Sequence, residues 1–141
     1  MKKRFVLIPC LLLLALLSAC GGNPGETSAS APSTEITVEM GEFMFEPANF
    51  AVPAGEEITL TLTNSGAIEH SLAILAKDYT YTAPFNDDDQ ANALQTFKLK
   101  AGESQVFTFT APADPGEYQV VCDIAGHGEA GMVGNMKVVQ P

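Results

Sequence analysis

From Glu35 onward, apolar and polar residues alternate in short runs that are separated by turn-forming residues. The clearest runs contain Ile36, Val38 and Met40; Ile58, Leu60 and Leu62; His70, Leu72 and Ile74; Tyr118, Val120 and Cys122; and Met132, Met136 and Val138. Turn signals such as Pro53-Ala54-Gly55 and Asn64-Ser65-Gly66 lie between them. This pattern predicts an all-β fold, an antiparallel sandwich or barrel. The length of 141 residues suits one such domain, which we place at residues 35–141.

The stretch from Lys77 to Gln95 is less regular, and we interpret it as a long connection that crosses the sandwich. Helical periodicity is limited to one short turn near Asp88 to Leu94. The acidic triplet Asp87-Asp88-Asp89 could dock a partner or could simply be a solvated loop.

The N-terminus carries the features of an export signal. Three basic residues follow Met1, and Phe5 to Ala19 is an apolar run, too short for a membrane span of about 20 residues. The run ends in Leu17-Ser18-Ala19-Cys20, which resembles the bacterial lipobox with Cys20 as the lipid acceptor. An ordinary cleaved signal or an uncleaved anchor are the alternatives.

These features divide the N-terminal part in two. We predict a signal peptide at residues 1–19, then a lipidated Cys20 and a flexible linker over residues 20–34, rich in Gly, Ser and Pro. The lipid would anchor the domain to a bacterial membrane, on the periplasmic or extracellular side.

The charge balance limits the possible partners. The whole chain has a formal net charge of −10, and loss of residues 1–19 would leave four basic residues against 17 acidic ones, a net charge of −13. Such a chain will not bind nucleic acid or an anionic membrane surface by charge. It would favour a basic partner, although the charge could serve solubility alone.

Residues that bind metals are scarce, yet several occur close together. After processing, Cys122 would be the one internal cysteine, and His70 and His127 are the only histidines. Each alone is weak evidence, because single buried Cys, His and Met residues often belong to a core. However, Cys122, His127 and Met132 follow one another at five-residue intervals, and Gly126 allows the chain between them to bend.

Two imidazoles, one thiolate and one thioether suit copper, and a His₂Cys plane with a weak axial Met is the blue-copper arrangement. Zinc accepts His and Cys, but a thioether is a poor zinc ligand. A binuclear CuA centre would need a second cysteine in the loop. Copper enzymes need additional histidines, which this chain lacks, so we expect no enzyme activity.

The segment CDIAGHGEAGMVGNMKVV resembles the C-terminal ligand loop of the cupredoxins, the small blue copper proteins, and its spacing is most similar to that of auracyanin and azurin. The segment NFAVPAGEEITLTLTNSGAIEHSLAIL resembles the earlier strands of that family. The resemblance implies a Greek-key β-sandwich of about eight strands. It also implies one type 1 copper ion held by His70, Cys122, His127 and, axially, Met132.

The resemblance leaves some details open. Met136 is the rival for the axial position, although its place among strand residues favours the core. Ser71 stands where many cupredoxins have asparagine, and would brace the ligand loop with a shorter reach. Ala125 replaces a frequent proline, and Asp123 replaces an uncharged residue, which bears on the reduction potential.

The predicted function is a membrane-tethered carrier that passes single electrons between redox proteins, with the His127 edge facing the partner. A basic c-type cytochrome or a membrane electron-transfer complex would suit the acidic charge, and we expect a monomer. The alternative is an extracytoplasmic module for copper delivery or buffering. A metal-free structural domain would not account for four ligands in register.

Overall fold

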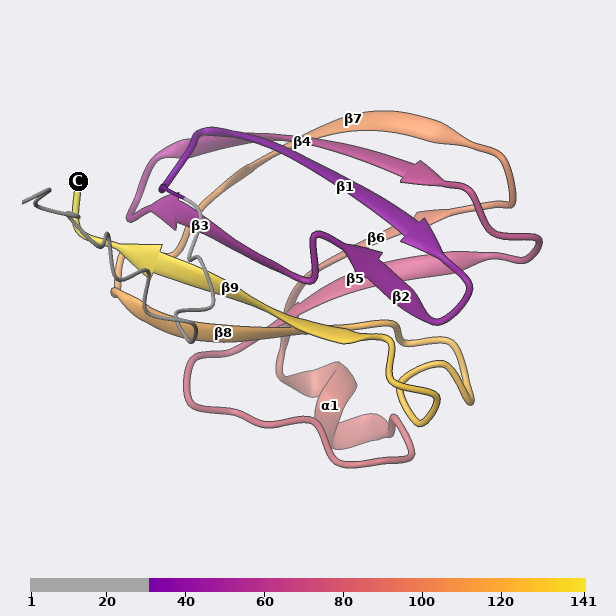
Figure 1. Ribbon diagram of the computed structural model, residues 1–141. Helices are drawn as coiled ribbons and strands as arrows, with labels where there is room; N and C mark the ends of the chain where they lie inside the picture. Colours follow the sequence, from indigo (N-terminus) through magenta and orange to yellow (C-terminus); the bar gives the residue numbers. More distant parts are fainter. Residues whose placement is uncertain (1–30) are drawn as a thin grey trace, which may run out of the picture.

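The computed structural model describes residues 31–141, which form two β-sheets packed face to face (Figure 1). The elements are β1 (Glu35–Gly41), β2 (Met44–Glu46), β3 (Asn49–Pro53), β4 (Glu57–Asn64), β5 (His70–Leu75), α1 (Asp87–Ala91), β6 (Ala93–Leu99), β7 (Ser104–Thr110), β8 (Gly116–Val121) and β9 (Val133–Val139). The predicted signal peptide, the lipidated Cys20 and most of the linker fall in residues 1–30, outside the described residues.

The two sheets have the strand orders β2-β1-β4-β7 and β3-β9-β8-β5-β6. Most neighbours are antiparallel, but β1 pairs with β4 in parallel, and so does β3 with β9. The prediction of an all-β sandwich is confirmed, with nine strands in the described residues rather than about eight. The antiparallel pairing expected from the alternation holds for most neighbours but not for these two pairs, because alternation reports which face is buried and not the direction of the neighbouring strand.

The core between the sheets follows from the alternation. In β1 and β4 every second residue is buried, because successive side chains of a strand point to opposite faces. Burial of these apolar side chains supplies the main stabilisation, at about 25 cal/mol per Å² removed from water. Met40, Tyr118 and Met136 lie in the same cluster, which also includes Cys122 and Met132. The core therefore reaches one end of the sandwich without interruption.

Three strands escaped the pattern analysis. β2 has only three residues, and β3 has three consecutive buried residues rather than alternating ones. β6 begins inside the stretch that we interpreted as a connection. Its alternation is weak, because only Phe97 and Leu99 of its residues are buried. These strands depend on their neighbours for pairing more than on their own pattern.

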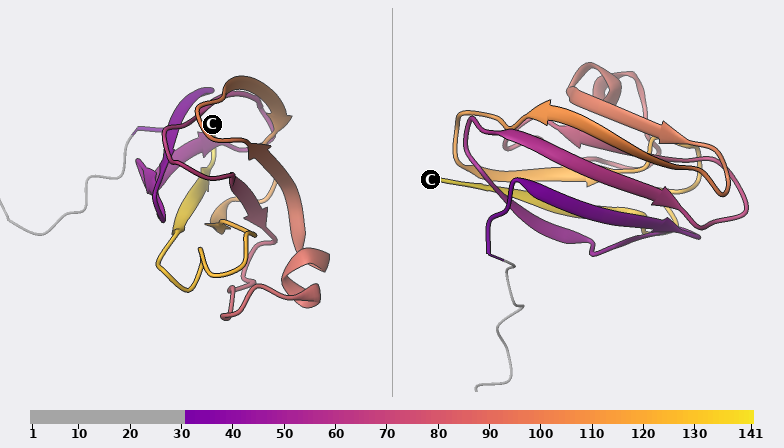
Figure 2. Two further views of the ribbon diagram at one scale, coloured as in Figure 1. Left: turned by 90° about the vertical axis from the view of Figure 1, so that its right-hand side faces the viewer. Right: turned by 90° about the horizontal axis from the view of Figure 1, so that it is seen from above.

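The connection between β5 and β6 packs against the outer face of the five-stranded sheet (Figure 2). There Ala73, Leu75 and Val121 form a second apolar cluster, covered by Tyr79, Tyr81 and Phe85 among others. The connection contains the short helix α1, whose first residue lies one position before the predicted turn. Predicted helical residue Leu94 instead belongs to β6.

The three residues of the acidic triplet differ in their exposure to solvent. Asp87 and Asp88 are exposed, whereas Asp89 is fully buried. The Asp89 carboxylate accepts hydrogen bonds from the Asn86 backbone N–H at 2.9 Å and from the Tyr79 hydroxyl at 3.0 Å. Together with the Asn86 side chain it forms a capping box for α1. Asp89 therefore holds the connection between β5 and β6 in place. This structural role differs from both interpretations of the triplet, a solvated loop and a docking site for a partner.

The functional residues lie at one end of the sandwich. Figure 1 shows the β8–β9 loop, the β1–β2 turn and the β4–β5 turn at the end opposite the C-terminus. Among residues 31–141, no helix has the length and apolar character needed to cross a membrane.

Candidate copper centre

The β8–β9 loop brings the predicted ligands of the C-terminal segment together. β8 and β9 are antiparallel neighbours, and beyond their last pair the Cys122 N–H donates to the Met132 carbonyl at 3.1 Å. Met132 N–H in turn donates to the His127 carbonyl at 3.0 Å, and His127 N–H donates to the Ile124 carbonyl at 3.0 Å. These backbone bonds fold the loop back over the strand end, as the five-residue spacing predicted.

His70 reaches the same place from the first residue of β5. The turn before it is held by Asn64, a fully buried side chain that donates to the Ile68 and Leu99 carbonyls at 2.8 and 2.9 Å. Its amide oxygen accepts from Gly66 N–H at 2.9 Å. The sequence analysis used this segment only as a turn signal. The structure shows that Asn64 fixes the position from which His70 points inward.

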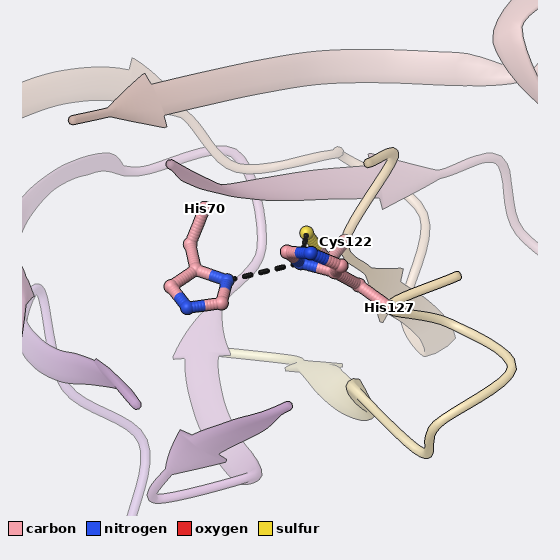
Figure 3. A group of neighbouring side chains, drawn as sticks. All are labelled: His70, Cys122 and His127. Atoms are coloured by element: carbon pink, nitrogen blue, oxygen red, sulfur yellow. Dashed lines mark hydrogen bonds between the residues drawn. The ribbon is translucent and has the colours of Figure 1, made fainter. Parts of the chain in front are cut away.

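Three donor atoms converge at this end of the core, as Figure 3 shows. The His70 Nδ1 and His127 Nδ1 atoms are 3.1 Å apart, and Cys122 Sγ is 3.4 Å from His127 Nδ1. All three side chains are buried, with exposed fractions of 0%, 4% and 0% for His70, His127 and Cys122. The ligand atoms lie within 4.8 Å of one another.

Met132 and Met136 are both fully buried, so burial does not separate the two axial candidates. Their positions do differ. Met132 is in the ligand loop, with its backbone bonded to those of Cys122 and His127. Met136 lies within β9, opposite Phe50 and Tyr118 in the neighbouring strands, as expected of a core residue.

The donor set fits a metal ion. Two nitrogen ligands, each about 2.0 Å from a tetrahedral metal, lie roughly 3.3 Å apart, close to the separation of the two Nδ1 atoms. Within the described residues His70 Nε2 is buried and has no hydrogen-bond partner. The one polar contact of the His70 ring is therefore made by Nδ1, the atom that points at the other donors.

The surroundings keep His70 in the form that binds metals. Burial lowers the pKa of His70, the neighbouring His127 lowers it further, and the Glu42 carboxylate opposes both effects. A lowered pKa means that the imidazole stays neutral to a lower pH than an exposed histidine does. Because only the neutral ring can donate a lone pair to a metal, the environment favours binding.

The turn between β1 and β2 covers the two histidines. This contact was not predicted from the sequence. The Glu42 carboxylate accepts from the Ala67 N–H at 2.6 Å, in the turn before His70. The Phe43 ring packs edge-on against the His127 ring, with centroids 5.1 Å apart at 82°. Phe43 has a positive φ of 59°, which is uncommon for a residue other than glycine. No local pattern signals a contact between residues so far apart in the chain.

Ser71 braces the ligand loop, as expected from its position after His70. Its backbone N–H donates to Cys122 Sγ at 3.4 Å, and its hydroxyl accepts from the Asp123 N–H at 2.9 Å. Both contacts connect β5 to the end of β8, so the first histidine and the cysteine are held in a common frame.

Comparisons with known proteins agree with this geometry. Residues 32–139 match the family described as copper binding proteins, plastocyanin/azurin family. Auracyanin-A of Chloroflexus aurantiacus is 29% identical over 150 residues, covering 88% of this chain and 90% of that protein. The copper-resistant cuproprotein CopI of Rubrivivax gelatinosus is 32% identical over 123 residues, covering 83% and 72%.

Solved structures give the same result. The dithionite-reduced auracyanin of Roseiflexus castenholzii superposes with a TM-score of 0.65 at 30% identity, covering 77% of this chain and 99% of that one. The chain therefore belongs to the plastocyanin/azurin family of copper-binding proteins. The prediction of an auracyanin-like cupredoxin is confirmed, and copper is the cofactor.

The close packing of Gly66 against His70 gives a testable prediction. A Cβ atom at Gly66 would lie 2.6 Å from His70 Nε2 and 2.9 Å from Cδ2. Gly66→Ala should therefore displace the ring, weaken copper binding at least tenfold and lower the stability of the apoprotein by about 1–3 kcal/mol. Copper titration and thermal melting would measure the two effects.

Gly41→Ala is the matched control. Its Cβ would lie 3.3 Å from Cγ of the flexible Met44 side chain and at an ordinary contact distance of 4.0 Å from Ser65 Oγ, so both quantities should stay close to those of the unsubstituted protein. Equal effects of the two substitutions would contradict the role of Gly66 in seating the ring.

Proposed function

We propose that the protein is a blue copper electron carrier, with His70, Cys122 and His127 as the strong ligands and Met132 as the axial one. The observation that carries the proposal is the convergence of two imidazole nitrogens and one thiol sulfur in a buried group. A His₂Cys set with a weak axial thioether is the arrangement of blue-copper electron-transfer sites.

The bound copper would supply a one-electron couple between Cu(I) and Cu(II). The chain's own residues hold the donors apart at nearly fixed distances, through the loop hydrogen bonds and the Asn64 turn. A rigid donor set limits how far atoms must move when an electron arrives. The burial of the donors also excludes water, which supports a role without substrate chemistry and hence no enzyme activity.

The surface near the centre supports a transient contact with a redox protein. His127 is only 4% exposed, so a partner would approach its small exposed edge and the adjoining Phe43, which is 41% exposed. Met44 and Ile68 are also exposed in this part of the fold, and Glu42 and Glu69 stand next to them in the chain. An apolar contact bordered by carboxylates suits a partner with a basic rim, such as a c-type cytochrome.

Copper delivery or buffering is the second candidate, favoured by the similarity to a protein named for copper resistance. A delivery site would be expected to expose its donors for exchange. Here His70 and Cys122 are fully buried. Met44 is exposed on β2, but it is the one exposed thioether in the described residues, so a stepwise handover has few intermediates to use.

We further propose that the exported protein is tethered to the membrane through a lipid on Cys20. The order of basic start, apolar run and small residues before Cys20 supports this. A linker over residues 20–34 would then keep the copper domain close to membrane-bound partners.

The tether predicts the behaviour of Cys20→Ser. Without the thiol no lipid can be attached, so the variant should not incorporate a labelled fatty acid and should leave the membrane fraction or keep its signal. Metabolic labelling followed by fractionation measures this. Cys10→Ser changes a thiol inside the predicted signal peptide and should keep the label. Label on the Cys20→Ser protein would exclude this anchor.

The choice of axial ligand predicts a difference between two methionines. Met132→Leu should retain the intense visible absorption and raise the reduction potential, because it removes a donor that favours Cu(II). Met136→Leu is the matched control and should shift the potential much less. Spectroelectrochemistry would measure both, and a larger shift for Met136→Leu would assign the axial position to Met136 instead.

An electron carrier and a copper-delivery module differ in what they transfer to the partner: the carrier passes an electron and keeps its copper, whereas the delivery module passes the copper ion. We expect the reduced protein to pass an electron to an oxidised basic cytochrome within a stopped-flow experiment and to keep its copper. The rate should fall as salt rises from 0.01 to about 0.1 M, where the screening length is about 10 Å. Cys122→Ser, which lacks the thiolate, is the colourless control.

The opposite result is equally specific. Slow electron transfer, combined with rapid passage of copper to an apo-acceptor protein, would favour delivery over electron transport.

A further inference from the structure

A charged pair lies directly beside the copper ligands, on the outer face of the five-stranded sheet. Lys98 Nζ is 2.9 Å from Asp123 Oδ2, and the side chains are 49% and 5% exposed, respectively. Lys98 is on β6 opposite Ser71 of β5, and Asp123 follows Cys122 at the end of β8. The pair therefore connects β6 to the end of β8, across β5, and so lies beside the segments that carry the first histidine and the cysteine.

Both oxygens of the Asp123 carboxylate are engaged. The Ser71 hydroxyl donates to Oδ1 at 2.7 Å, while Lys98 occupies Oδ2. The same hydroxyl accepts from the Asp123 N–H at 2.9 Å. The carboxylate is thus fixed in place, with one neutral donor and one cation, and is nearly excluded from water.

The position of this carboxylate determines which hydrogen bond Ser71 donates to the Cys122 sulfur. The Ser71 hydroxyl and N–H both lie 3.4 Å from Cys122 Sγ. Because the hydroxyl proton is directed at Asp123, the backbone N–H is the donor that Ser71 offers to the sulfur. Hydrogen bonds to the cysteine sulfur tune the potential of blue copper sites, and so does a nearby fixed charge that solvent screens poorly.

We propose that Asp123 and Lys98 set the reduction potential of the centre as an opposed pair of charges. The Asp123 carboxylate favours the oxidised state, because that state carries one more positive charge. The Lys98 ammonium offsets part of this effect. One electron from a redox-protein partner reduces the copper, and no bond is made or broken at either residue. The proposal rests on the copper electron-transfer function proposed above.

A purely structural role is the competing interpretation. An ion pair that only braced the loop would loosen in the same way whichever partner was removed. Opposed charges instead predict shifts of opposite sign. The sign of the potential shift therefore separates the two roles, whatever happens to stability.

The test is a cycle of Lys98→Gln, Asp123→Asn and the double variant, each loaded with copper and measured by spectroelectrochemistry. Lys98→Gln should lower the potential, because it leaves the carboxylate unopposed. Asp123→Asn should raise it, and the amide oxygen can still accept from Ser71. The double variant should lie between the single variants. The intense visible band should remain in all three.

Two further variants serve as controls. Lys137→Gln on β9 removes the same charge from the exposed surface of the same sheet, next to Glu117 in register, and should shift the potential much less than Lys98→Gln. Lys98→Arg keeps the positive charge and should restore the original potential. Thermal melting of the apoproteins reports the bracing contribution separately, since both single variants should melt lower there.

The outcomes are distinguishable. Shifts of the same sign, or no shift in coloured Lys98→Gln and Asp123→Asn proteins, would overturn the charge-pair proposal and leave the copper function intact. If Asp123→Asn failed to fold, Lys98→Gln against Lys137→Gln would still decide the question, since Lys98 is half exposed. If the copper-loaded protein without substitutions gave no intense visible band, both this proposal and the copper electron-transfer function on which it rests would be wrong.

Discussion

The antiparallel pairing of β8 and β9 is the constraint on which the copper centre depends. The ladder ends at Val121 and Val133, and the next contact joins the backbones of Cys122 and Met132. Because the chain must pair with β8 again directly after this short loop, the loop has few accessible conformations. The hydrogen bonds inside the loop restrict its conformation further. His127, halfway along, is consequently held against Cys122 by the backbone of the loop.

The second half of the centre comes from a different part of the chain and depends on sheet order. β5 lies between β8 and β6, so the first residue of β5 stands beside the end of β8. The buried side chain of Asn64 then sets the turn that leads into it. Burying such polar groups is costly unless they are paired. The centre therefore assembles on strong, satisfied hydrogen bonds, while the donor atoms themselves point at one another.

The sequence predicted those parts of the structure that are encoded locally. Alternation located β1, β4, β5 and β8, and the even spacing of Cys122, His127 and Met132 indicated one loop around one metal. The elements that depend on distant neighbours were missed. β6 was missed because only Phe97 and Leu99 of its residues are buried, so the strand shows little alternation. The parallel pairing of β1 with β4 leaves no mark on either strand. Phe43, likewise, meets His127 only after the fold has formed.

Prediction from residue type also has a limit that Asp123 illustrates. An acidic residue next to a copper ligand could be read from the sequence, but its partner could not, because Lys98 lies on a strand that alternation failed to detect. The fold explains why such a pair can exist here. His70 and Cys122 face the inner core, whereas Ser71, Asp123 and Lys98 meet on the outer face of the same three strands.

This separation has a physical consequence for how such a centre can vary. Inner-face substitutions change donor distances and core packing together, because interiors are close-packed. Charges on the outer face act on the same donors through space and through Ser71, without entering the core. The Lys98 ammonium can therefore change while the donor geometry stays the same. A sheet that carries ligands on one face and charges on the other allows one scaffold to support different reduction potentials.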